Sequence, residues 1–181
     1  SSLLSTRGRK SKVRAMNFTI AKGKHYCDKL LYRLSRFLNF SPVMKASVVF
    51  DQSCRYEIEG IDRLDLNKLV GFSVGWRHHA QSVRFAWRYD RSQDKIELWS
   101  YIYDNGTRFT EFVGYAPFDE KVDLQITDHN RSYVFSMNYR EFSKANFISK
   151  TRKFSMGYKL WPYFGGNLTA PHNMKLSLKI N

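Results

Sequence analysis

Hydrophobic and polar residues alternate over several short stretches of this chain, as they do in β-strands that bury one face. The clearest stretch is 82–89, where Val83, Phe85, Trp87 and Tyr89 alternate with Ser82, Arg84, Ala86 and Arg88. Similar patterns predict strands at 16–20, 44–50, 68–74, 96–103, 157–164 and 174–180. Between residues 28 and 40 the apolar residues instead repeat at helical spacing, which predicts a short amphipathic helix or a shaped loop.

Two turns determine how the central strands pair. Asn105-Gly106 is the dipeptide most typical of a type I′ hairpin turn, and Ser92-Gln93 lies between the two preceding strands. The resulting pairs are Ile102 with Phe109, Leu98 with Val113, Trp87 with Leu98, and Val83 with Ile102. Because the two registers agree, three consecutive strands are expected to share one apolar face.

A turn at His129-Asn130 predicts a further hairpin. It pairs Val122 with Met137, Leu124 with Phe135, and Ile126 with Tyr133. Short strands joined by tight turns, without alternating helices, are typical of a sandwich or barrel. We therefore predict an all-β protein, an antiparallel β-sandwich of the jelly-roll or concanavalin type, with one domain at residues 16–181.

Positive charge is concentrated at the start of the chain. The net charge is +14, and residues 1–45 hold 11 Lys or Arg side chains against Asp28 alone. Residues 1–15 are therefore expected to form a basic N-terminal arm that binds an anionic partner or a neighbouring subunit. The β-domain itself is much closer to neutral.

The remaining bulk features say less about function. Cys27 and Cys54 allow one disulfide or two buried thiols. No apolar run is long enough to span a bilayer, and no signal peptide is visible. We expect an extracellular, cell-surface or virion location, with no cofactor and no metal.

Two segments carry a family resemblance. Residues 122–138 (VDLQITDHNRSYVFSMN) and 158–180 (YKLWPYFGGNLTAPHNMKLSLKI) resemble the concanavalin-like lectin and glucanase superfamily. The PYFGGN…APH portion is also similar to uncharacterised jelly-roll proteins of bacterial surfaces and their phages. The resemblance implies the fold but transfers no activity. The glycosidase carboxylate motif of that superfamily is missing from the sequence, which argues against a glucanase.

The face of the central strands opposite the core is rich in aromatic and basic side chains. It should carry Arg84, Arg88, Glu97, Trp99, Tyr101, Tyr103, Arg108, Thr110 and Phe112. Aromatic rings offer apolar platforms to sugars, and Arg offers paired hydrogen bonds to carboxylate, sulfate or phosphate. Arg88 should pair with Glu97, whereas Arg84 should be a partly exposed cation that meets an anionic ligand first. A second layer or another subunit covering this face is the alternative.

These features suggest three functions. The first is a non-catalytic glycan-binding or adhesion module, in which the ligand is bound by Arg84, Trp99, Tyr101, Tyr103 and Arg108. The second is a structural protein of a large assembly, anchored by its basic arm. The third is a polysaccharide lyase, for which an Arg must neutralise a uronate and a His or Tyr must move protons; the candidates are Arg84, Tyr101, His78 and His79.

The other histidines have a simpler interpretation. His25 follows the first predicted strand and His172 precedes the last, so the two lie close together if those strands are antiparallel neighbours. A cluster of histidines can bind zinc, but no carboxylate or Cys has matching spacing. We therefore expect structural loop histidines.

Overall fold

The computed structural model describes residues 14–29, 36–38, 43–129, 132–138, 140–146 and 156–181. This part of the chain consists of strands and two short 3-10 helices. The strands are β1 (Met16–Ile20), β2 (Arg36–Leu38), β3 (Val43–Phe50), β4 (Asn67–Ser73), β5 (Ser82–Asp90), β6 (Lys95–Asp104), β7 (Thr107–Ala116), β8 (Val122–His129), β9 (Ser132–Met137), β10 (Arg140–Asn146), β11 (Met156–Leu160) and β12 (Met174–Ile180). The 3-10 helices are η1 (Gln52–Cys54) and η2 (Ile61–Leu64).

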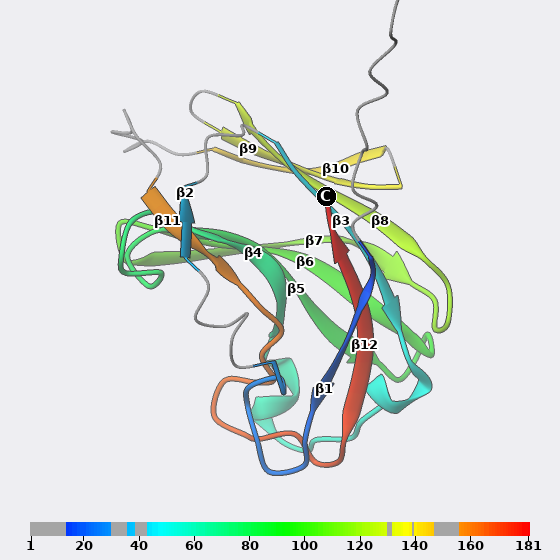
Figure 1. Ribbon diagram of the computed structural model, residues 1–181. Coiled ribbons are helices and arrows are strands. Elements are labelled where there is room, and N and C mark those ends of the chain that lie inside the picture. Colours follow the sequence, from blue (N-terminus) through cyan, green and yellow to red (C-terminus); the bar gives the residue numbers. More distant parts are fainter. Residues whose placement is uncertain (1–13, 30–35, 39–42, 130–131, 139, 147–155) are drawn as a thin grey trace, which may run out of the picture.

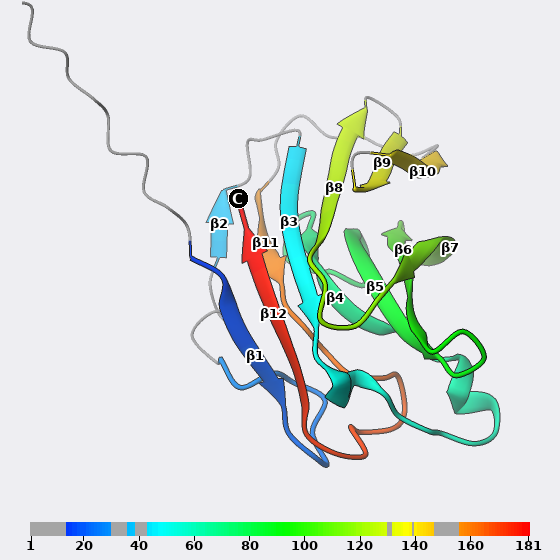
Figure 2. The same ribbon diagram turned by 90° about the vertical axis from the view of Figure 1, so that its right-hand side faces the viewer.

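Two antiparallel sheets pack face to face, as Figure 1 and the rotated view in Figure 2 show. The first sheet has the order β1-β12-β3-β8-β9-β10, and the second has the order β2-β11-β4-β5-β6-β7. The first and last described strands are neighbours, since β1 pairs with β12. The predicted antiparallel β-sandwich of the concanavalin type is thus confirmed.

The core lies between the sheets and is built from the inward side chains of both. Trp87 and Phe85 of β5 are fully buried, and they pack against Phe50 of β3 and Phe135 of β9 respectively. Alternation along β5 places the core residues on one side and Arg84 and Arg88 on the other. The fold therefore determines which side of the second sheet can carry a site.

The predicted registers of the central hairpins hold with one exception. Trp87 pairs with Leu98, Val83 with Ile102, and Ile102 with Phe109, as predicted. Leu98 pairs with Gly114, however, so the predicted pairing with Val113 is wrong. A bulge at this point inserts one extra residue into β7, which the alternation pattern alone does not reveal.

The register of the β8–β9 hairpin is shifted by two residues from the prediction. Leu124 pairs with Met137 and Ile126 with Phe135, whereas Tyr133 pairs with Asp128. A shift of two keeps every side chain on its predicted face, because the side-chain period of a strand is two. The apolar residues consequently still meet in the core.

The segment predicted as a helix or shaped loop contains β2, so residues 36–38 form a strand and not a helix. Residues 30–35 and 39–40 of that segment lie outside the described residues, as do residues 1–13 of the basic arm. Cys27 and Cys54 are both buried, and they form no disulfide. No helix in the described ranges is long and apolar enough to cross a membrane.

Candidate functional site

A cleft of about 510 Å³ opens on the outer side of the second sheet, and we call it the Arg84 cleft. Strands β4 to β7 form its floor, and the segment 158–167 forms a wall. Its basic lining residues are Lys68, Arg84, Arg108 and Lys159, and its aromatic and imidazole residues are Tyr26, His78, His79, Tyr101, Tyr103, Tyr158, Trp161 and Tyr163. No Asp or Glu is among the described residues that line it. The cleft is therefore strongly cationic.

Arg84 lies at the base of the cleft and is only 7% exposed. Its Nε makes no hydrogen bond to any described residue, and its guanidinium carbon lies 4.9 Å from the centre of the Tyr101 ring. Burial lowers the pKa of Arg84. The expectation of a partly exposed cation is wrong, because the Tyr101 ring packs against Arg84, and Tyr158 and Tyr163 of the segment beside β4 lie close enough to act on its charge.

Gly71 of β4 makes room for Arg84. It pairs directly with Arg84, and a Cβ atom on Gly71 would lie 2.1 Å from the Val83 carbonyl oxygen and 2.3 Å from the Arg84 Cβ. Only a glycine fits at such a close approach of two strands. No pattern in the sequence indicates this contact, because it depends on a pairing between β4 and β5 that no tight turn predicts.

Lys68 is a second, partly buried cation in the cleft, and sequence reasoning missed it. Its Nζ donates a hydrogen bond of 2.8 Å to the Gly165 carbonyl oxygen and lies 5.1 Å from the centre of the Tyr101 ring. Burial lowers the pKa of Lys68 to about 8, and repulsion by Arg84 contributes. Lys68 and Arg84 thus both contact the Tyr101 ring, at a place where a carboxylate would be expected to neutralise them.

Two predicted tyrosines stand beside these cations. The ring centres of Tyr101 and Tyr103 are 5.8 Å apart, and the guanidinium carbon of Arg108 lies 6.0 Å from that of Tyr101. A hydrogen bond with Tyr101 raises the pKa of Arg108, whereas burial raises the pKa of Tyr103. The structure therefore brings Arg84, Tyr101, Tyr103 and Arg108 into one cleft.

The histidine pair adds groups that can move protons. His78 Nδ1 lies 2.6 Å from the hydroxyl of Tyr158, and the ring of His79 meets that of Tyr103 edge-on at 5.4 Å. Burial lowers the pKa of His78 to about 4, with further contributions from His79 and Arg84. His78 is consequently neutral at pH 7. Tyr158 was not a predicted site residue, although its strand was predicted.

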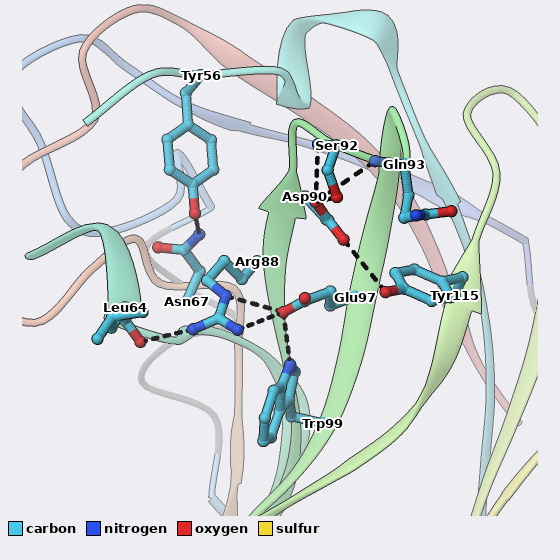
Figure 3. Close-up of polar contacts among 10 residues, drawn as sticks. All are labelled: Tyr56, Leu64, Asn67, Arg88, Asp90, Ser92, Gln93, Glu97, Trp99 and Tyr115. Carbon is cyan, nitrogen blue, oxygen red and sulfur yellow. Dashed lines mark hydrogen bonds and ion pairs between the residues drawn. The ribbon is translucent and has the colours of Figure 1, made fainter. Parts of the chain in front are cut away.

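Trp99 does not line the cleft. It lies beside Arg88 and Glu97 (Figure 3). Its Nε1 donates a hydrogen bond of 3.0 Å to Glu97 Oε2, and the guanidinium carbon of Arg88 lies 5.2 Å from the centre of its ring. The predicted Arg88–Glu97 pair is present, with Arg88 Nη2 at 2.6 Å from Glu97 Oε2. Arg88 and Glu97 therefore hold the Trp99 ring in place.

The loop histidines are bound to backbone carbonyl groups. His25 Nδ1 lies 2.8 Å from the Phe164 oxygen, and His172 Nε2 lies 2.7 Å from the Ser53 oxygen. Within the described ranges, no three side chains of the types that ligate metals are grouped together. These two histidines link loops at one end of the sandwich.

The fold is shared with solved structures of proteins that act on glycans. An alginate lyase, AlyC3, matches with a TM-score of 0.63 and 13% sequence identity over 94% of this chain and 75% of that one. An alginate lyase from Klebsiella pneumoniae matches with a TM-score of 0.54 and 7% identity, over 77% of this chain and 58% of that one. SCLam, a non-specific endo-β-1,3(4)-glucanase of family GH16, matches with a TM-score of 0.52 and 8% identity, over 82% and 60%.

These TM-scores show a common architecture, the concanavalin-like jelly roll. No family model matches the sequence, and no curated protein sequence matches it either. The same fold carries different activities in these proteins, so function has to be argued from the cleft itself.

Proposed function

We propose that this protein binds an acidic polysaccharide in the Arg84 cleft. The observation that carries the proposal is the burial of Arg84 among other cations, without any acidic side chain among the described residues of the cleft lining. A buried charge is costly unless it is paired. A sugar carboxylate or sulfate would supply the missing partner, because a guanidinium group binds such oxyanions through two parallel hydrogen bonds.

The aromatic rings fit the rest of a sugar. Tyr103 and Tyr163, which are partly exposed, give the cleft apolar surfaces next to hydroxyl groups that can donate and accept hydrogen bonds. Glycan binding is also compatible with the architecture, since one matching structure is an alginate lyase in complex with dimannuronate. Hydrolysis is not favoured in this cleft, because glycosidases use a pair of carboxyl groups.

Binding is tested by titration with an acidic and a neutral polysaccharide of similar length. We expect saturable binding of the acidic chain only, and a loss of at least about 30-fold in affinity on Arg84→Gln, about 2 kcal/mol for a charged hydrogen-bonding partner. Lys45→Gln is the matched control, because it removes one exposed positive charge from the first sheet. Equal losses in both variants would contradict the proposal.

A second candidate function, cleavage of the bound chain by β-elimination, is favoured by the His78–Tyr158 pair at 2.6 Å. Arg84 would neutralise a uronate carboxylate, which acidifies the proton on the neighbouring carbon. A neutral imidazole or a phenolate would take that proton, the electron pair would form a carbon–carbon double bond, and the glycosidic carbon–oxygen bond would break. The leaving oxygen would be protonated by a phenol or imidazolium group.

Elimination leaves an unsaturated sugar, which absorbs ultraviolet light. An increase in absorbance that is lost in Tyr158→Phe, with binding retained, would support lyase activity. Tyr115→Phe is a suitable control, because Tyr115 lines no part of the cleft. Tight binding without any increase in absorbance would show that the protein binds the polysaccharide without cleaving it. The structural-assembly hypothesis rests on residues 1–15, and residues 1–13 lie outside the described ranges.

A further inference from the structure

A second hollow of about 560 Å³ lies on the same side of the second sheet, and we call it the Arg88 groove. It runs between the segment 56–64 and the ends of β5 and β6 nearest their connecting turn. Tyr56, Glu59, Leu64, Arg88, Tyr89 and Glu97 are among the residues that line it. The proposed function does not include this groove, although Arg88 and Glu97 belong to the face that the sequence predicted.

The groove and the Arg84 cleft are adjacent. Arg84 and Arg88 lie on the same side of β5, four residues or about 13 Å apart along the strand. Trp99 stands next to Arg88, and alternation along β6 puts it on the same side as Tyr101 of the cleft. One extended saccharide chain can therefore occupy both hollows.

Their relative position is fixed by a buried amide. Asn67 accepts a hydrogen bond of 2.6 Å from the backbone N–H of Gly165, which lines the cleft. Its Nδ2 donates a hydrogen bond of 2.9 Å to the hydroxyl of Tyr56, which lines the groove (Figure 3). Both hollows are thus attached to a single residue that is 1% exposed.

The two hollows differ sharply in charge. The cleft lining holds four Lys or Arg side chains and no described carboxylate. The groove lining holds Glu57, Glu59, Asp90 and Glu97 against Arg63, Arg88 and Arg91, a balance of four acidic to three basic groups.

Two of the three cations that line the groove are also engaged already. Arg88 binds Glu97 through Nη2 at 2.6 Å, and its Nη1 donates to the Leu64 carbonyl oxygen at 3.1 Å. Arg91 lies 3.4 Å from Glu57. An acidic sugar in the groove would meet Glu59 and Asp90 with the exposed Arg63 as the one cation among the described lining residues outside these ion pairs, so its like-charge contacts are only partly offset and binding is disfavoured.

We infer that the Arg88 groove binds an uncharged sugar unit of the same chain whose acidic unit occupies the Arg84 cleft. The preferred ligand is therefore a polysaccharide in which acidic and neutral sugars alternate, and a polymer of uronic acids alone is disfavoured. The groove's paired donors and acceptors, Arg88 with Glu97 and Arg91 with Glu57, suit the hydroxyl groups of a neutral sugar. Trp99 offers its ring to a sugar between the two hollows. This inference rests on the proposed function of the cleft.

The test compares two acidic oligosaccharides of equal length by isothermal titration of the full chain. One is an oligomannuronate, with a carboxylate on every unit, and the other is a hyaluronan oligosaccharide, in which glucuronate alternates with N-acetylglucosamine. We expect the alternating ligand to bind at least about tenfold more tightly, because one like-charge contact is removed. Glu59→Lys should then raise oligomannuronate affinity about fivefold or more, and hyaluronan affinity less than about twofold.

Glu120→Lys is the matched control, since it makes the same charge change at an exposed position that lines neither hollow. Tighter binding of oligomannuronate by the unaltered protein would overturn the inference, as would equal effects of Glu59→Lys and Glu120→Lys. Should Glu59→Lys fail to fold, Glu59→Gln makes the same comparison with half the charge change. If neither ligand binds, or if Arg84→Gln leaves both affinities intact, it is the proposed function that fails.

Discussion

Arg84 lies directly opposite Tyr101 in the antiparallel pair of β5 and β6, with its guanidinium carbon 4.9 Å from the centre of the ring. The ammonium group of Lys68 approaches the same ring to 5.1 Å. The electrons of the ring attract both cations, but the two cations repel one another. An anionic ligand that reaches them would relieve this repulsion, so the ligand-free cleft is an unfavourable arrangement of charge that binding improves.

Lys68 should make ligand affinity depend on pH. Its pKa is about 8, so its charge is lost as the pH rises through this value, and affinity for an acidic oligosaccharide should fall. The bound anion stabilises the charged form, so the fall should begin at or above pH 8. In Lys68→Arg the charge persists, and titrations from about pH 7 to 9 should give a nearly flat profile. An equally steep fall in this variant would show that another group is responsible.

The free energy of unfolding should change in the opposite direction with pH. The pKa of Lys68 is lowered from 10.5 to about 8 in the folded protein, so the unfolded chain binds more protons between these values. Stability therefore rises with pH over this window, and below pH 8 the full destabilisation is present. Chemical denaturation at several pH values should show a smaller rise in Lys68→Met than in the unaltered protein. Matching slopes in the two proteins would rule out Lys68 as the cause.

Gly71→Ala should damage both the fold and the cleft. Its methyl group would collide with the Val83 carbonyl oxygen at 2.1 Å, so the strands must separate, at a cost of about 1–3 kcal/mol. Arg84 would move with β5, and affinity for the acidic ligand should drop as well. Gly114→Ala is the control, because its nearest contacts are the mobile end of Met137 at 3.3 Å. Denaturation and titration of the two variants should differ clearly, and equal stability would show that β4 and β5 adapt.

Replacing only one partner of the Arg88–Glu97 pair should lower the stability of the protein substantially. The side chains of Arg88 and Glu97 are 18% and 12% exposed, so Arg88→Met leaves a largely buried carboxylate without its cation. We expect a loss of about 2–4 kcal/mol in stability, most of which Arg88→Met/Glu97→Gln should recover. Arg91→Met breaks the exposed pair with Glu57 and should cost less than about 1 kcal/mol. A double variant less stable than Arg88→Met alone would contradict this account.

The sequence predicted the central hairpins well because local turns join their strands. Asn105 and Gly106 both have positive φ, as the Asn-Gly motif requires, and this turn sets the register of β6 and β7. The bulge beside Leu98 and the two-residue shift of the β8–β9 hairpin escaped prediction, since neither changes which residues are apolar. β2 was missed because its residues also fit a helical repeat.

The cleft was only half predictable from the sequence. Alternation along β5, β6 and β7 placed Arg84, Tyr101, Tyr103 and Arg108 on one face, and the structure keeps them together. Lys68 and Tyr158 come from strands whose neighbours are distant in the sequence, so no pattern could bring them to Arg84. The same long-range packing buries Arg84. Alternation shows which side of a sheet a residue lies on, but it does not show which residues cover the outer side.

Burial of Arg84 changes how salt should affect binding. Salt screens exposed charges strongly and buried ones weakly. Arg84 is 7% exposed, whereas Arg108 lies on an exposed part of β7 at the rim of the cleft. In titrations at low and high salt, the loss caused by Arg84→Gln should therefore stay nearly constant, and the loss caused by Arg108→Gln should shrink as salt rises. Lys45→Gln, remote from the cleft lining, should change affinity little at either concentration. If high salt instead erased the effect of Arg84→Gln, Arg84 would contact the ligand in a solvent-exposed position. The cleft would then be more open than the burial of Arg84 indicates.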